Sequence, residues 1–130
     1  METKKTLRKV KLKYTKRVDM SWADLSSADF SSANLLYANL HNANLHNADL
    51  HYADLTNANL HNADLHYADL TNANLHNANL HNADLHYADL TNADLTNADL
   101  TNADLFNTKI EKKWGYKFSE EQKRRIKWVD

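Results

Sequence analysis

The chain has no cysteine and no proline, and it has one glycine among its 130 residues. Without cysteine no disulfide framework can form. A single glycine, Gly115, cannot build the glycine-rich loops that hold nucleotide phosphates. No apolar run approaches the roughly 18 residues of a membrane span. The first residues, METKKTLRKVKLKYTKR, lack the apolar region of a secretory signal. These absences predict a soluble protein without a membrane partner, which would be cytoplasmic if it is natural.

Positive charge is missing from most of the chain. All sixteen lysines and arginines lie within residues 4–17 or 109–127, and residues 18–108 contain none. Those residues contain twelve aspartates, so the net charge of −1 conceals an acidic middle between two basic ends. A segregation of this kind influences partners and association rates rather than the fold.

The middle of the chain repeats with a period of five residues. Leucine stands at every fifth position from 25 to 105, with Phe30 in the same series, and alanine stands two residues before each. Five helical residues turn the chain by about 500°, so these leucines would spiral around a helix instead of forming a buried stripe. Ala-x-Leu suits a three-residue strand, in which alanine and leucine face one side and the intervening Asp or Asn faces the other.

Two residues separate successive strands, mostly His-Asn, Thr-Asn or His-Tyr, and they must turn the chain. Asparagine favours such a corner because it tolerates left-handed backbone angles better than most residues. A strand and a corner repeated in the same sense predict a solenoid whose axis is filled by the apolar side chains.

This run of Ala-Asp/Asn-Leu-x-x units resembles the pentapeptide-repeat family from Val18 to about Lys112. Nineteen consecutive units match, counting the degenerate VDMSW at 18–22 and TKIEK at 108–112. The resemblance implies an all-β fold, a right-handed quadrilateral parallel β-helix (β-solenoid) with four units in each coil of twenty residues. Residues twenty apart are then expected to stack at about the 4.8 Å spacing of paired strands.

Three segments are predicted: a basic N-terminal cap in 1–17, the solenoid in 18–112 and a C-terminal cap in 113–130. The stretch RKVKLKYTK alternates apolar residues with lysines, which favours a half-buried capping strand. Ser119 and Gln122 have the spacing of a capping box, which predicts a short capping helix from about Glu120 to Trp128. Caps protect the strand edges and apolar core at the ends of a solenoid.

Stacking by twenty places four aspartates in one column. Like charges this close repel, so stability alone would not select such an acidic ladder. One interpretation is an interaction surface that imitates the DNA phosphate backbone, as the resemblance implies for gyrase-binding members of the family. The other is a solubilising surface in which Asp is simply the consensus letter. The ladder consists of Asp29, Asp49, Asp69 and Asp89, continued by Lys109.

Stacking also predicts two columns of histidine. Imidazoles beside aspartates suit zinc, copper or nickel. A metal site also needs a fixed geometry and outer hydrogen-bond partners, which an open, flat ladder does not offer, so we expect no metal site and no cofactor. A straight-sided prism implies no concave pocket, and no Ser or Cys nucleophile is evidently paired, which argues against an enzyme. The columns are His46, His66 and His86, and His41, His61 and His81.

Fifteen residues, HNADLHYADLTNANL, occur at 46–60 and again at 61–75, and return at 81–95 with one change. So little divergence favours an idealised, designed sequence. The main functional hypothesis is therefore a non-enzymatic repeat scaffold of synthetic origin with no natural ligand, either a monomer or an end-to-end dimer. The alternative is an acidic, DNA-mimicking module whose acidic face binds a DNA-binding protein such as a type II topoisomerase.

Overall fold

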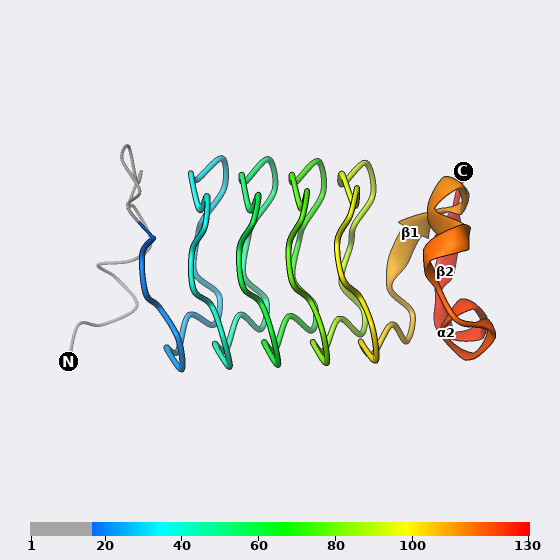
Figure 1. The fold of residues 1–130 in the computed structure, drawn as a ribbon, viewed down its shortest axis with the longest axis horizontal. Coiled ribbons are helices and arrows are strands. Elements are labelled where there is room, and N and C mark those ends of the chain that lie inside the picture. Colours follow the sequence, from blue (N-terminus) through cyan, green and yellow to red (C-terminus); the bar gives the residue numbers. More distant parts are fainter. Residues whose placement is uncertain (1–16) are drawn as a thin grey trace.

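The computed structural model describes residues 17–130, which form a shaft of stacked coils with the C-terminal segment at one end (Figure 1). The predicted N-terminal cap and its strand fall on residues 1–16, apart from Arg17, and so lie outside the described residues. No helix in the described part of the chain is long and apolar enough to cross a membrane.

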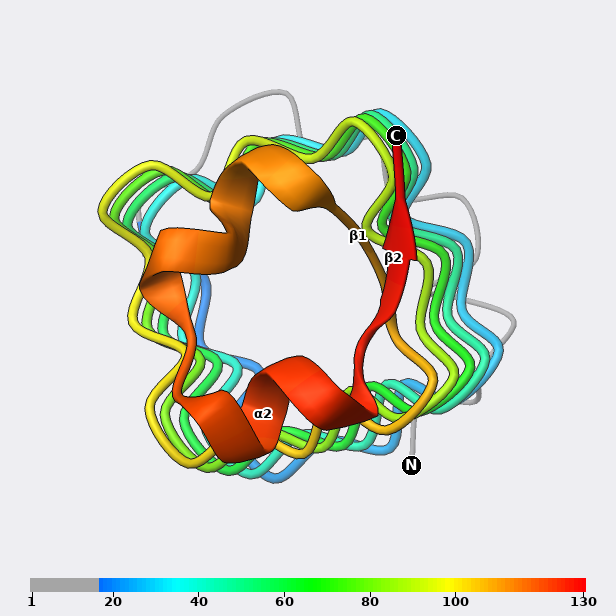
Figure 2. The ribbon, with the colours of Figure 1, turned by 90° about the vertical axis from the view of Figure 1, so that its right-hand side faces the viewer.

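Each coil contains twenty residues and has four sides. Parallel bridges join residues twenty apart in an unbroken series from Asp19↔Asn39 to Asp89↔Lys109. Viewed along the axis, the coils superimpose on a roughly square outline (Figure 2). The C-terminal chain winds counter-clockwise in this view while it approaches the viewer, so the winding is right-handed. The expected stacking of residues twenty apart is therefore confirmed.

The corners depend on left-handed backbone angles. Eighteen non-glycine residues, one in every five from Trp22 to Asn107, have φ between 53° and 62°. Each turn is closed by a backbone bond across it, as where the Ala48 N–H donates to the Leu45 carbonyl at 2.9 Å. Asparagine fills most of these positions, as its tolerance of this region predicts. The corners at Tyr52 and its equivalents show that the fold imposes the same angles on tyrosine.

The strands between corners are shorter than the sequence predicted. Only the central Asp or Asn of each unit forms a bridge, rather than three residues. A corner at every fifth residue leaves too little extended backbone for a longer ladder. Successive coils are nevertheless well connected: Leu45 N–H donates to the Asp64 carbonyl at 2.7 Å, and Asp64 N–H donates to the Ala43 carbonyl at 3.0 Å.

The core is a column of alanine and leucine along the axis. The leucines of the repeat are at most 5% exposed, and most are fully buried. Ala23 in the first coil is only partly buried, unlike the alanines that follow, because it lies near the end of the stack. Most of the intervening Asp and Asn residues are half-buried rather than fully exposed, because the neighbouring coils cover part of each side chain.

The longer regular elements all lie at the C-terminal end. Strand β1 (Lys109–Glu111) is followed by the 3-10 helix η1 (Lys112–Lys117), helix α2 (Glu120–Arg125) and strand β2 (Lys127–Val129). Strands β1 and β2 pair in parallel, so this segment adds a further irregular coil to the shaft (Figure 2).

Helix α2 begins as predicted but ends early. Ser119 Oγ accepts the Gln122 N–H at 3.2 Å and Gln122 Oε1 accepts the Ser119 N–H at 3.1 Å, which completes the capping box. The predicted end at Trp128 is wrong: Ile126 takes an extended conformation, with φ −71° and ψ 138°, and Trp128 lies in β2. Pairing with β1 across the coil overrides the helical tendency of the last residues.

Candidate functional site

The acidic ladder lies on one side of the shaft, as the twenty-residue stacking requires. Its four aspartates are joined by consecutive parallel bridges. Lys109 continues the column, and its Nζ lies 3.4 Å from Asp89 Oδ2. The geometry therefore assembles every residue of the predicted column, Asp29, Asp49, Asp69, Asp89 and Lys109.

Each carboxylate of the ladder also closes its own turn. Asp29 Oδ1 accepts the Ser31 N–H at 2.9 Å and the Ser31 hydroxyl at 2.6 Å. Asp69 and Asp89 accept the same two bonds from the threonines two residues later. Such Asx turns satisfy backbone donors that would otherwise be left over at the corner. The aspartates thus have a local structural role that does not depend on a partner.

These bonds favour the ionised form of two of the four carboxylates, Asp29 and Asp89. The Ser31 hydroxyl, and after it the Ser31 backbone N–H, hold the pKa of Asp29 below its ordinary value. Burial raises the pKa of Asp89, but bonds from Thr91 and the charge of Lys109 outweigh it, so that pKa is also lowered. Hydrogen bonds to the charged form favour it, which offsets the repulsion expected of a ladder.

Acid should weaken the shaft because of these lowered pKa values. A carboxyl whose pKa is depressed by folding stabilises the protein above its unfolded pKa of about 3.9, and this stabilisation is lost as the pH falls through the folded value. We expect the midpoint of thermal unfolding, followed by circular dichroism, to fall between about pH 5 and pH 2. Asp29→Asn keeps an acceptor for the Ser31 N–H and should show a smaller fall; an identical acid profile for both proteins would contradict this assignment.

His51 lies beside the ladder and was not singled out from the sequence. Its Nδ1 lies 2.6 Å from Asp49 Oδ1, and this contact, strengthened by the charge of Asp69, raises the pKa of the imidazole. One feature of the sequence could have identified this contact. Asp49 and His51 are two residues apart, which is also the spacing of the Asx turn.

The histidine columns are present as predicted, but their surroundings differ. The rings of His41, His61 and His81 stack at 5.2 Å between centroids, and the residues two before them are asparagines. The rings of His66 and His86 lie 4.7 Å apart, and aspartates stand two residues before them. Of these two columns, only that of His66 and His86 has direct contacts between an imidazole Nδ1 and a carboxylate, from Asp64 and Asp84.

An aromatic row runs along the corner beside the His66 column. The rings of Tyr67 and Tyr87 stack at 4.9 Å, and Phe106 meets Tyr87 edge-on at 5.7 Å. Arg125 covers the end of this row, because its guanidinium lies 5.9 Å from the Phe106 ring and 3.0 Å from Asp104. The sequence did not predict this contact, which brings together residues about twenty positions apart.

The coil of four short sides, the left-handed corners and the axial leucines define a β-solenoid repeat protein. The chain belongs to the pentapeptide-repeat family. The family model, pentapeptide repeats (8 copies), matches residues 23–62, 38–77, 58–97 and 73–111. A comparison with curated proteins found no match.

Two cyanobacterial crystal structures show the same fold. The pentapeptide-repeat protein Rfr23 from Cyanothece 51142 is 40% identical, with a TM-score of 0.68, over 74% of this chain and 63% of its own. HetL from Nostoc sp. strain PCC 7120, involved in the regulation of heterocyst differentiation, is 32% identical, with a TM-score of 0.65, over 72% of this chain and 54% of its own. This chain therefore spans less than two thirds of the length of either protein.

Proposed function

We propose that the shaft is a non-enzymatic structural scaffold, an idealised repeat of synthetic origin with no natural ligand. The observation that carries this proposal is the equivalence of Asp and Asn in the turns. Asn44 Oδ1 accepts the His46 N–H at 3.0 Å, and Asp64 Oδ1 accepts the His66 N–H at 3.1 Å. Because Asp and Asn close the same turn, the fold alone explains why one of these two residues stands at the centre of the repeat units.

The copied segment supports the same proposal. Fifteen residues make three sides of a four-sided coil, so each adjacent copy is shifted by one side. Tyr52 and Tyr67 occupy the same place in their copies but lie in different columns, whereas Tyr67 stacks on Tyr87. The adjacent copies at 46–60 and 61–75 therefore repeat the internal pattern while the surface moves by one side, as a sequence chosen for the fold would do.

The C-terminal segment, 113–130, acts in this proposal as a cap. Phe118 and Ile126 are buried, and Trp114 and Trp128 pack against the same core. Gln122 Nε2 donates to the Leu100 carbonyl at 2.9 Å, which satisfies a backbone group at the open end of the last coil. A cap at this end leaves a monomer, or a dimer joined through the opposite end.

The alternative is an acidic binding module that competes with DNA for a basic groove. What favours it is that Asp29 and Asp89 have lowered pKa values, so these two carboxylates stay charged at neutral pH. The shaft from 18 to 108 also offers twelve aspartates and no lysine or arginine. A partner of this kind is a DNA-binding protein such as a type II topoisomerase.

One experiment separates the two proposals. The protein is added to a DNA gyrase supercoiling assay, alongside a variant in which the four ladder aspartates are changed to asparagine. The scaffold predicts no inhibition by either protein at micromolar concentration. A DNA mimic predicts inhibition that weakens steeply with salt and is lost in the variant, because charge complementarity would drive the binding. Inhibition that depends on the four carboxylates would reject the scaffold proposal.

A further inference from the structure

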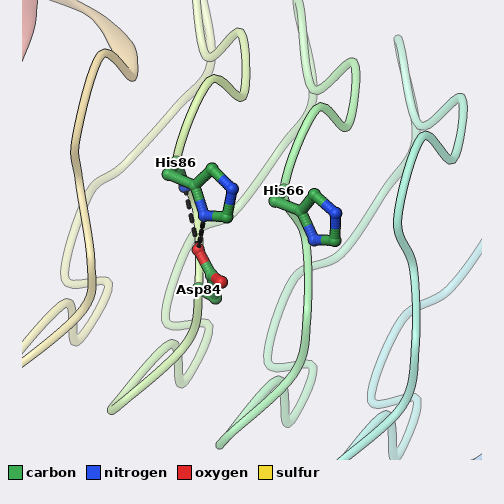
Figure 3. A group of neighbouring side chains, drawn as sticks. All are labelled: His66, Asp84 and His86. Carbon is green, nitrogen blue, oxygen red and sulfur yellow. Dashed lines mark hydrogen bonds and ion pairs between the residues drawn. The ribbon is translucent and has the colours of Figure 1, made fainter.

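A cluster of two imidazoles and a carboxylate lies on the side of the shaft next to the ladder, since Asp84 stands five residues before Asp89. Figure 3 shows its three residues. One donor atom from each of His66, Asp84 and His86 lies within 4.8 Å of the others. All three residues are half-buried, so they are partly held by neighbouring coils and still reachable from solvent. Residues from two successive coils meet here, and only the stacking of coils brings them together.

A carboxylate orients each of the two imidazoles. Asp84 Oδ1 lies 2.5 Å from His86 Nδ1 and also accepts the His86 backbone N–H, which ties it to the chain (Figure 3). Asp64 makes the equivalent contact with His66 Nδ1. In metal sites a histidine ligand commonly donates its second ring N–H to a carboxylate, which fixes the orientation of the ring and raises its basicity.

The outer ring nitrogens of His66 and His86 are available. In His46, one coil earlier, Asn47 Nδ2 lies 2.9 Å from Nε2 and the His66 carbonyl lies 3.2 Å from Nδ1, so both nitrogens are occupied. His66 and His86 are each followed by tyrosine instead of asparagine. Within residues 17–130, no side chain forms a hydrogen bond with their Nε2 atoms.

We propose that this cluster binds a divalent transition-metal ion, Zn²⁺, Ni²⁺ or Cu²⁺, through the Nε2 atoms of His66 and His86, while Asp64 and Asp84 orient the two rings through Nδ1. The sequence argument against a metal rested on the lack of a fixed geometry and of outer partners; the structure supplies an outer partner for His66 in Asp64. Imidazole nitrogens suit these ions, whereas all-oxygen sites suit magnesium and calcium. Zinc bonds of about 2.0–2.2 Å require the donor atoms to close in by on the order of 1 Å, which rotation of partly exposed side chains allows.

The chain contains a matched control for this proposal. His61 and His81 stand in the same relation as His66 and His86, with their rings 5.2 Å apart and nearly parallel. Asn79 takes the place of Asp84, so the control pair lacks a carboxylate at that position, although Asp99 in the next coil lies close enough to feel the charge of both rings. A second group, on the ladder side, has one imidazole and two carboxylates and must be removed from the measurement. It consists of Asp49, His51 and Asp69.

The test is a calorimetric titration of the full chain, without a polyhistidine tag, with Zn²⁺ at neutral pH. His51→Asn serves as the background, so that the ladder group contributes little. We expect one ion bound with a Kd on the order of micromolar, about −8 kcal/mol by conversion. His86→Ala and Asp84→Asn should each weaken binding at least 10-fold, while His61→Ala should leave it within about twofold.

A gain of binding provides the converse test. Asn79→Asp gives the control pair the carboxylate that it lacks, and we expect a second Zn²⁺ equivalent in this variant. Circular dichroism in a chelator, with unchanged spectra and melting midpoints, confirms that each variant is folded. Equal weakening by His61→Ala and His86→Ala, absence of binding up to millimolar Zn²⁺, or no second equivalent with Asn79→Asp would each overturn the proposal.

Discussion

Replacing Leu65 with alanine should lower the free energy of unfolding by about 2–5 kcal/mol, through lost transfer energy and the cavity that remains. Leu65 is fully buried in the middle of the shaft, with leucines of the adjacent coils above and below it. The coils can relax only slightly into this cavity, because each corner is held by a backbone hydrogen bond. Denaturant unfolding followed by circular dichroism measures the loss.

His61→Ala is the matched control for this substitution. It removes a half-buried surface side chain four residues away, and it should change stability by less than about 0.5 kcal/mol in a chelating buffer. Leu65→Asp should prevent folding, because it places an unpaired charge in the axial core. Similar losses for Leu65→Ala and His61→Ala would contradict the assignment of inside and outside.

Deleting residues 113–130 should turn the protein into oligomers. The deletion removes Phe118 and Ile126 from the core and takes β2 away from β1. It also removes Gln122, whose amide donates to the Leu100 carbonyl. The last coil then presents buried leucines and unpaired backbone groups to solvent, and such edges recruit other chains. Analytical ultracentrifugation of the truncated protein measures the effect.

A milder variant distinguishes the loss of the cap from general unfolding of the truncated protein. Gln122→Ala keeps the segment but removes the bond to Leu100 and half of the capping box. We expect it to stay monomeric with a lower melting midpoint. A truncated protein that sediments as a stable monomer would show that residues 113–130 are not a cap.

The fold could be predicted from the sequence because its information is local and repeated. The five-residue period identifies the inward alanines and leucines, and the asparagines mark the corners. Both features depend on sterics within a few residues, namely the alternation of side chains in extended backbone and the tolerance of left-handed angles. The ladder of Asp29, Asp49, Asp69 and Asp89 followed once the coil length of twenty was known.

The tertiary structure decided what depends on contacts between coils. Strands shrank to single bridges because corners limit the extended backbone, and Trp128 left the predicted helix to pair with β1. Tyr67 takes a left-handed angle that its own preference disfavours, because the coils on either side fix the turn. Arg125 reaches Asp104, and His66 comes beside His86 and Asp84, because residues about twenty apart become neighbours only when the chain has completed a coil.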